Sequence, residues 1–245
     1  KGWQEEPYWK PFFDGFHPVH RWLITARPDV AVLFYNDHGL NFFLDKMPTF
    51  AVGAATHYQN ADEGWGLPVM RPFPGAEALS WHIIEQLVQH DFDITMCQQM
   101  KVDHAFTVPL ALAWPGADNR PVRIVPIAIN TVQHPLPSPA RCLALGRAVH
   151  DAVVGWEGAE RVVIFGTGGL SHQLDGERAG FINKDYDHFC MDHLGADPDA
   201  LTRHSPVDIV ELAGSQGIEI LNWIAARGAL GNDVRELSRN YHIPI

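Results

Sequence analysis

Strand-like and helix-like stretches alternate along this 245-residue chain, and this alternation is the feature that most constrains its fold. Short runs rich in β-branched and aromatic residues predict strands, and apolar residues at helical spacing predict helices. We expect strands at 29–35, 92–97, 122–130 and 161–165, and helices at 76–90, 139–154, 184–194 and 215–227. This order is typical of an α/β fold with a mixed central β-sheet flanked by helices on both faces.

Two residues predict details of these elements. Pro126 has no N–H to donate, so we expect the strand at 122–130 to lie at a sheet edge or to carry a bulge. Gly228 is expected to end the last helix. In sheets of this class ligands bind beyond the carboxyl ends of the strands, so the residues that follow strands are the first candidates for a site.

The composition excludes several classes of protein. A hydrophobic fraction of 46% excludes intrinsic disorder, and no apolar run is long enough to span a membrane. The net charge of -11 and the lack of a basic stripe argue against partners such as nucleic acids or anionic membranes. The three cysteines Cys97, Cys142 and Cys190 lie far apart and form no disulfide framework or structural zinc motif, which favours a cytoplasmic protein.

The length fits one domain over residues 1–245. The chain begins at Lys1 and ends at Ile245 after a proline, so we expect residues to be missing at both ends. Its most unusual number is its 14 histidines. Histidine is a common metal ligand and carries protons near neutral pH, so the count points toward a site.

Three histidines are placed where a site is expected. His38 ends Tyr-Asn-Asp-His directly after the first strand, and His172 ends Gly-Thr-Gly-Gly-Leu-Ser-His directly after the strand at 161–165. His104 follows an aspartate at the start of an apolar stretch. Each has a structural alternative: a strand-to-loop transition, a structural turn, and a partly buried histidine with a backbone partner, respectively.

Glu219 is the only charged residue in an apolar stretch at 217–226. A carboxylate there is costly unless it is compensated, so it either lies on a solvent stripe with Asn222 or serves a buried cation. Two acids in Ala-Asp-Glu-Gly-Trp-Gly at 61–66 could bind a hard cation, but a structural turn is the preferred interpretation. Two histidines and a carboxylate form the ligand set of non-haem Fe(II) oxygenases, although spacing alone does not show which residues converge.

Eight motifs resemble, in the same order, the catalytic β subunits of class III extradiol dioxygenases of the protocatechuate 4,5-dioxygenase type. They are Y-N-D-H at 35–38, P-T-F-A-V-G at 48–53, A-D-E-G-W-G at 61–66, V-D-H at 102–104, G-T-G-G-L-S-H-Q-L at 166–174, G-E-R-A-G-F-I-N at 176–183, G-S-Q-G-I-E at 214–219 and R-G-A-L at 227–230. The resemblance covers essentially the whole chain. The run at 166–174 is specific to this class, which includes gallate and 3-O-methylgallate dioxygenases.

The resemblance implies Fe(II) as the cofactor and a role for each candidate residue. His38 and Glu219 match iron ligands, and a further iron-binding histidine of the family would lie upstream of Lys1. His172 matches the catalytic base, and His104 matches a histidine that donates a proton in related enzymes. We also expect substrate contacts from three residues of the same motifs: Asn36, Gly169 and Ser171.

The resemblance further implies extradiol cleavage of a catechol carboxylate, with both atoms of O2 inserted to give a ring-opened semialdehyde acid. Protocatechuate is the first substrate expected, and gallate and 3-O-methylgallate are the alternatives. A zinc-dependent enzyme or a non-catalytic protein of the same fold is a more distant alternative. The family also implies an oligomer and a small helical α subunit, or a fused equivalent of it.

Overall fold

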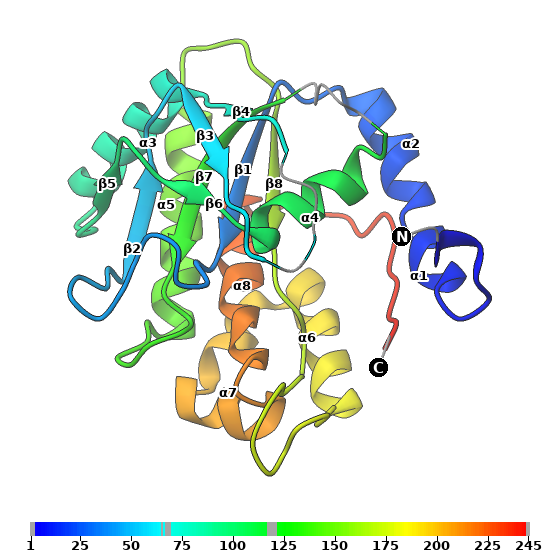
Figure 1. The fold of residues 1–245 in the computed structure, drawn as a ribbon. Coiled ribbons are helices and arrows are strands. Elements are labelled where there is room, and N and C mark those ends of the chain that lie inside the picture. The colour runs from blue at the N-terminus through cyan, green and yellow to red at the C-terminus, as the bar shows by residue number, and fades with distance from the viewer. Residues whose placement is uncertain (1–2, 65, 67–69, 117–121, 244–245) are drawn as a thin grey trace.

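The computed structural model describes residues 3–64, 66, 70–116 and 122–243. Its centre is a five-stranded sheet in the order β5-β2-β7-β1-β8 (Figure 1). These strands are β1 (Val30–Tyr35), β2 (Phe50–Gly53), β5 (Thr95–Cys97), β7 (Arg123–Ile129) and β8 (Val162–Gly166). Strand β1 is parallel to β7 and β8, whereas β2 is antiparallel to β7. The mixed sheet confirms the predicted α/β class.

The two faces of the sheet are covered differently. One face packs against α3 (Glu77–Gln89), α5 (Pro139–Val154) and α8 (Ile220–Ala229). The other packs against α4 (His104–Ala113) and a second sheet in the order β4 (Phe73–Pro74), β3 (His57–Asn60), β6 (Lys101–Val102). Every residue of β1 is buried because both faces are covered, which explains its unbroken apolar sequence.

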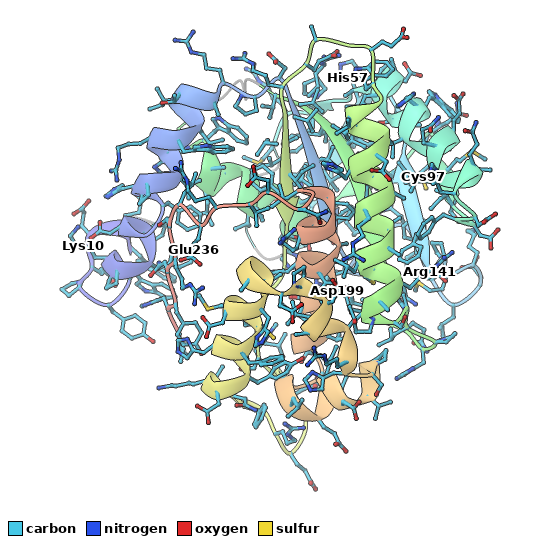
Figure 2. All side chains as sticks on the ribbon, turned by 180° about the vertical axis from the view of Figure 1, so that it is seen from behind. Lys10, His57, Cys97, Arg141, Asp199 and Glu236 are labelled. Carbon is cyan, nitrogen blue, oxygen red and sulfur yellow. The ribbon has the colours of Figure 1, made fainter. Side chains whose placement is uncertain are left out.

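Four further helices complete the described part of the fold. They are α1 (Lys10–Asp14), α2 (His17–Ala26), α6 (Lys184–Ala196) and α7 (Pro206–Ala213), with 3-10 turns at Trp3–Glu5, Pro198–Arg203 and Gly217–Glu219. Figure 2 shows the C-terminal segment at Glu236 beside the N-terminal helices at Lys10. Among the helices in the described ranges, none combines the length and the apolar character needed to cross a bilayer.

The prediction of an edge position or a bulge for the strand that contains Pro126 is wrong. Strand β7 lies inside the sheet, between β2 and β1. Its antiparallel ladder with β2 joins Ile127, Ala128 and Ile129 to their partners and stops before Pro126. Because the proline lies beyond that ladder, its missing N–H removes no bond to β2.

The prediction that Gly228 ends the last helix is also wrong, since α8 continues to Ala229. A Cβ on Gly228 would lie 2.5 Å from the carbonyl oxygen of Leu143 in α5. A Cβ on Gly146 of α5 would in turn lie 2.0 Å from the carbonyl oxygen of Ala225 in α8. These glycines are therefore required by the close approach of two helices and not by a helix end.

Candidate active site

The carboxyl ends of β1 and β8 lie side by side because the two strands are parallel neighbours. The Thr167 N–H donates to the carbonyl oxygen of Phe34 (3.0 Å), so the loops that follow the two strands leave the sheet together. His38 lies on the first loop and His172 on the second. Glu219 lies at the N-cap of α8, directly beside the second loop. The edge predicted to hold a site therefore brings these three residues together.

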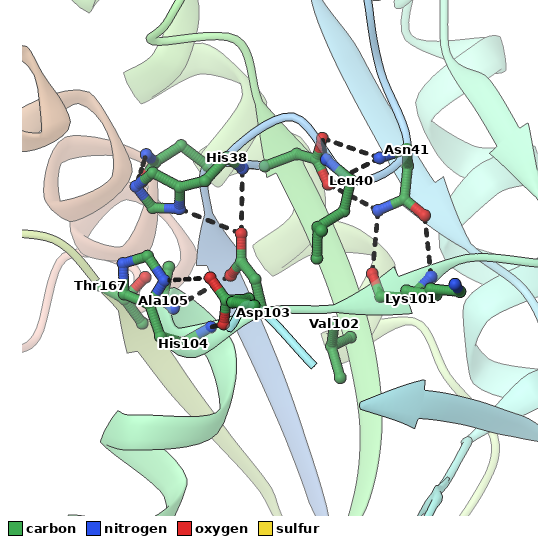
Figure 3. A network of polar contacts seen from close by, with 12 residues as sticks. His38, Leu40, Asn41, Lys101, Val102, Asp103, His104, Ala105 and Thr167 are labelled. Carbon is green, nitrogen blue, oxygen red and sulfur yellow. Dashed lines mark hydrogen bonds and ion pairs between the residues drawn. The ribbon is translucent and has the colours of Figure 1, made fainter. Parts of the chain in front are cut away.

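The loop after β1 is held by its own polar residues. The Asp37 carboxylate accepts the N–H groups of Leu40, Asn41 and Phe42. Asn41 then bonds β6 in both directions: its amide donates to the carbonyl of Lys101 (2.9 Å) and accepts the Lys101 N–H (2.8 Å) (Figure 3). These bonds fix the backbone on either side of His38, which restricts where its imidazole can lie.

The imidazole of His38 is oriented by Asp103. The carboxylate oxygen Oδ2 of Asp103 accepts the His38 backbone N–H (2.9 Å) and lies 3.0 Å from His38 Nδ1 (Figure 3). Its other oxygen accepts the Ala105 N–H (3.0 Å), so Asp103 also caps α4. A hydrogen on Nδ1 directs Nε2 away from Asp103, which is how carboxylates commonly orient metal-binding histidines. The sequence placed Asp103 beside His104 and gave no sign that it would serve His38.

Glu219 is buried, with 8% of its surface exposed. Its Oε2 accepts the Gly169 N–H (2.7 Å), and its Oε1 accepts from Asn36 Nδ2 (3.1 Å). The same Oε1 lies 3.6 Å from His38 Nε2. Asn222, which donates to Asn36 (3.1 Å), is fully buried. The solvent-stripe alternative for Glu219 and Asn222 is therefore wrong.

The charges of the site favour a cationic partner for Glu219. Burial by itself would lower the pKa of His38, but its hydrogen bonds to Asp103 and Glu219 and their negative charges raise it to about 10. Burial by itself would raise the pKa of Glu219, but the His38 and Gly169 hydrogen bonds and the nearby histidines lower it. The raised pKa of His38 and the lowered pKa of Glu219 have the same cause, because the imidazole lies between two largely buried carboxylates.

The donor pair His38 Nε2 and Glu219 Oε1 fits a divalent transition metal. Imidazole nitrogen and carboxylate oxygen are the donors that such ions take in non-haem iron sites, and a buried carboxylate needs a cation. Side-chain donor atoms of His38, Asp103 and His104 also lie within 4.8 Å of one another. Asp103 lies beside His38 Nδ1, whereas Glu219 lies beside Nε2, so we assign Asp103 to orienting His38 and not to holding the ion.

The glycine-rich turn brings its backbone close to two of the candidate side chains. Gly168 has a φ of +107°, and a Cβ there would lie 2.6 Å from Glu219 Cβ. A Cβ on Gly169 would lie 2.7 Å from His172 Cε1. The Nδ1 of His172 lies 2.8 Å from the carbonyl oxygen of Leu170. Because a carbonyl only accepts, Nδ1 carries the hydrogen, and Nε2 of the neutral ring holds the lone pair.

His104 opens α4 and lies over His38, with ring centroids 4.3 Å apart. The Glu63 carboxylate accepts its backbone N–H (2.8 Å) and lies 2.7 Å from its Nδ1. The structural turn predicted for the segment of Glu63 includes no partner for this residue. Trp65 of the same motif lies outside the described residues.

The three expected substrate contacts all have protein partners. Asn36 and Gly169 donate to Glu219 as described above. The Ser171 hydroxyl donates to Asp187 (2.8 Å) and accepts the Asn183 N–H (2.7 Å). Asp187 is 2% exposed and its role had no signal in the sequence.

Comparison with known proteins gives a match over nearly the whole chain. Residues 1–244 match the family described as the catalytic LigB subunit of aromatic ring-opening dioxygenase. A gallate dioxygenase of Pseudomonas putida strain KT2440 is 35% identical over 184 residues, which are 75% of this chain and 54% of that protein. A 2,3-dihydroxyphenylpropionate/2,3-dihydroxicinnamic acid 1,2-dioxygenase of Photorhabdus laumondii is 36% identical over 59% of this chain and 43% of its own length.

The chain thus spans about half the length of these curated relatives. Among solved structures, an uncharacterized protein of Escherichia coli K12 aligns with a TM-score of 0.52 and 14% identity. The alignment covers 86% of this chain and 81% of that one, and it supports the fold alone.

Proposed function

Since the chain belongs to the family of catalytic LigB subunits of aromatic ring-opening dioxygenases, we propose that it cleaves the ring of a catechol carboxylate in the extradiol manner. Both atoms of O2 enter the product, a ring-opened semialdehyde acid. The observation that supports this proposal is the pair His38 Nε2 and Glu219 Oε1, 3.6 Å apart, with the turn of His172 against the same carboxylate. A single catalytic domain over 1–245 is part of the proposal.

The proposed metal is Fe(II), held by His38 and Glu219, with a third histidine upstream of Lys1 expected from the family resemblance. When bound, ferrous iron supplies Lewis acidity toward the catechol oxygens and electrons for dioxygen. Asp103 directs the nitrogen lone pair of His38, and the Gly169 N–H with Asn36 fixes the orientation of the Glu219 carboxylate.

Two histidines carry out the proposed proton transfers. His172 is held by a backbone carbonyl, so its neutral ring can take a proton from a catechol hydroxyl at Nε2. His104 is held by a carboxylate, which complements the positive charge of a protonated ring. This difference in partners supports His172 as the base and His104 as the proton donor.

Protocatechuate is the first substrate we propose, on the resemblance of the motifs. Gallate is the second candidate, because a relative that shares 35% identity carries that name. 3-O-methylgallate is the third. A cytoplasmic location, an oligomer and a helical α subunit or fused equivalent are also part of the proposal.

Oxygen uptake tests the activity. The protein supplied anaerobically with Fe(II) is mixed with aerated protocatechuate, gallate or 3-O-methylgallate, and the ring-opened product is followed by absorbance. We expect uptake with at least one substrate, dependent on Fe(II) and not supported by Zn(II). His172→Phe should bind metal normally and lose turnover. No uptake with any of the three substrates would overturn the proposal, and full turnover in His172→Phe would overturn the base assignment.

A further inference from the structure

The two histidines that lie one over the other in the site are held in the same way by different acids. Asp103 binds the backbone N–H and lies beside Nδ1 of His38, and Glu63 does the same for His104, at 2.8 Å and 2.7 Å. A carboxylate that takes both groups of one histidine fixes its side-chain torsions and places the hydrogen on Nδ1. The ring of His104 therefore has one orientation and one tautomer.

Glu63 is not a solvent-facing acid of a turn. Its side chain is 10% exposed, and it reaches from the segment after β3 to the first residue of α4. That segment is anchored to β6, because the Ala61 N–H donates to the carbonyl of Val102 (3.0 Å). The Glu63 carboxylate also occupies an N–H of the first turn of α4, where a helix has no intrahelical acceptors.

The neighbouring acid behaves differently. The Asp62 carboxylate accepts the Gly64 N–H (2.9 Å) within its own turn, and Asp62 is exposed. The two adjacent acids of this motif thus have different roles. Asp62 stabilises the turn, whereas Glu63 points out of the turn and binds His104. This contrast supplies a matched control for any substitution at Glu63.

We propose that Glu63 is a positioning residue for ring cleavage, which holds the His104 imidazole over His38 in the tautomer that exchanges its proton through Nε2. The proposal rests on the proposed function, because the position of His104 affects catalysis only if His104 donates a proton during ring cleavage. Glu63 itself touches neither ring-cleavage substrate nor metal in this assignment.

Steady-state oxygen uptake on the Fe(II)-loaded protein tests the effect on catalysis. Glu63→Gln keeps the size of the side chain but replaces one acceptor oxygen by a donor, so it cannot accept both N–H groups. We expect kcat to fall on the order of 10- to 100-fold, with KM changed by less than roughly threefold, because a positioned proton donor contributes to the chemical step. Asp62→Asn should leave both constants near those of the unmodified protein.

A double-mutant cycle with His104→Ala tests whether Glu63 acts through His104. If it does, Glu63→Gln should cause little further loss of kcat in the His104→Ala background. Equal losses in both backgrounds, or an unchanged kcat in Glu63→Gln, would overturn the proposal. Metal binding by the variants, measured by calorimetry, should match that of the unmodified protein.

A measurement without turnover separates this proposal from the proposed function. The imidazole ¹⁵N shifts of His104 should report a hydrogen on Nδ1 in the unmodified protein and in Asp62→Asn, and a changed tautomer distribution in Glu63→Gln. Identical shifts in all three would overturn the role of Glu63 even in an active enzyme. If the His104 shifts change in Glu63→Gln but the unmodified protein cleaves none of the substrates, the proposed function is wrong and the role of Glu63 in holding His104 stands.

Discussion

The roles proposed for single residues in this site depend more on their hydrogen-bond partners than on residue type. Histidine is common in this chain, and His38, His104 and His172 differ in what holds Nδ1: a fully buried aspartate, a glutamate and a backbone carbonyl. Three chemically equal side chains therefore differ in the charge of the group that holds Nδ1. The same reasoning separates Glu219, which is buried beside an imidazole, from the exposed acids of the surface.

At the residue scale, metal binding is expected to depend on pH through His38. With its pKa raised to about 10, His38 is protonated in the metal-free protein at neutral pH, and a metal must displace that proton from the ring. The pKa of Glu219 is lowered, so this carboxylate stays ionised. Affinity for Fe(II), measured anaerobically by calorimetry between pH 6.5 and 8, should rise roughly tenfold per pH unit.

The number of protons released per metal gives the internal check, because titrations in buffers of different ionisation enthalpy should report about one proton. His38→Ala should bind far more weakly, whereas His90→Gln, a change at the exposed end of α3, should bind normally. An affinity that is flat over this pH range would contradict the assignment of His38 as a ligand.

At the scale of elements, the packing of α5 on α8 sets the position of Glu219. The two helices approach through Gly146 and Gly228, which leave no room for a Cβ. Since Glu219 lies at the N-cap of α8, the depth of this helix against the sheet also fixes the distance from its carboxylate to His38. The packing of α8 on α5 thus also sets the geometry of the proposed metal site.

Substitution of Gly146 by alanine should destabilise the protein, because the new methyl group would meet the backbone of α8. We expect a loss of about 1–3 kcal/mol in the free energy of unfolding, measured by urea denaturation. Gly195→Ala in α6 is the control: its Cβ meets nothing within 4 Å, so better helix propensity should stabilise by about 0.5–1 kcal/mol. Equal midpoints for the two variants would contradict the packing argument.

At the scale of the whole molecule, the C-terminal segment joins distant parts of the chain. Asn240 donates to the carbonyl oxygen of Pro11 near the N-terminus (3.3 Å). Tyr241 donates to the buried carboxylate of Asp187 (2.6 Å), which also accepts both the N–H and the hydroxyl of Ser171. Because Ser171 precedes His172, this network ties the end of the chain to the loop of the proposed base.

Loss of the Tyr241 hydroxyl should therefore destabilise the molecule. In Tyr241→Phe a buried carboxylate loses a donor, at a cost of about 1–3 kcal/mol in the free energy of unfolding. The matched control is Tyr35→Phe, because the buried Tyr35 hydroxyl has no hydrogen-bond partner in the described part of the chain and its removal should be neutral or stabilising. Thermal denaturation compares the two variants, and the reverse order of stability would contradict this prediction.

The sequence by itself predicted several of the local elements and the residues of the candidate site. Helical spacing predicted α5 with the bounds that it has, and the apolar run at 29–35 predicted β1, because burial on both faces leaves a local pattern. The run of glycines before His172 and the single carboxylate in the apolar stretch at 217–226 can be recognised for the same reason. They break a pattern that lies within a few residues.

The tertiary structure decided which groups meet. Asp103 serves His38 across 65 positions, and Glu63 serves His104 across 41, so neither pairing leaves a local signal. The predictions for Pro126 and Gly228 are wrong because the roles of these residues depend on a neighbouring strand or helix. The ladder with β2 stops before the proline, and the α5 backbone approaches the glycine. Local sequence encodes propensity and burial, whereas the partner that orients each imidazole is fixed only when distant segments pack.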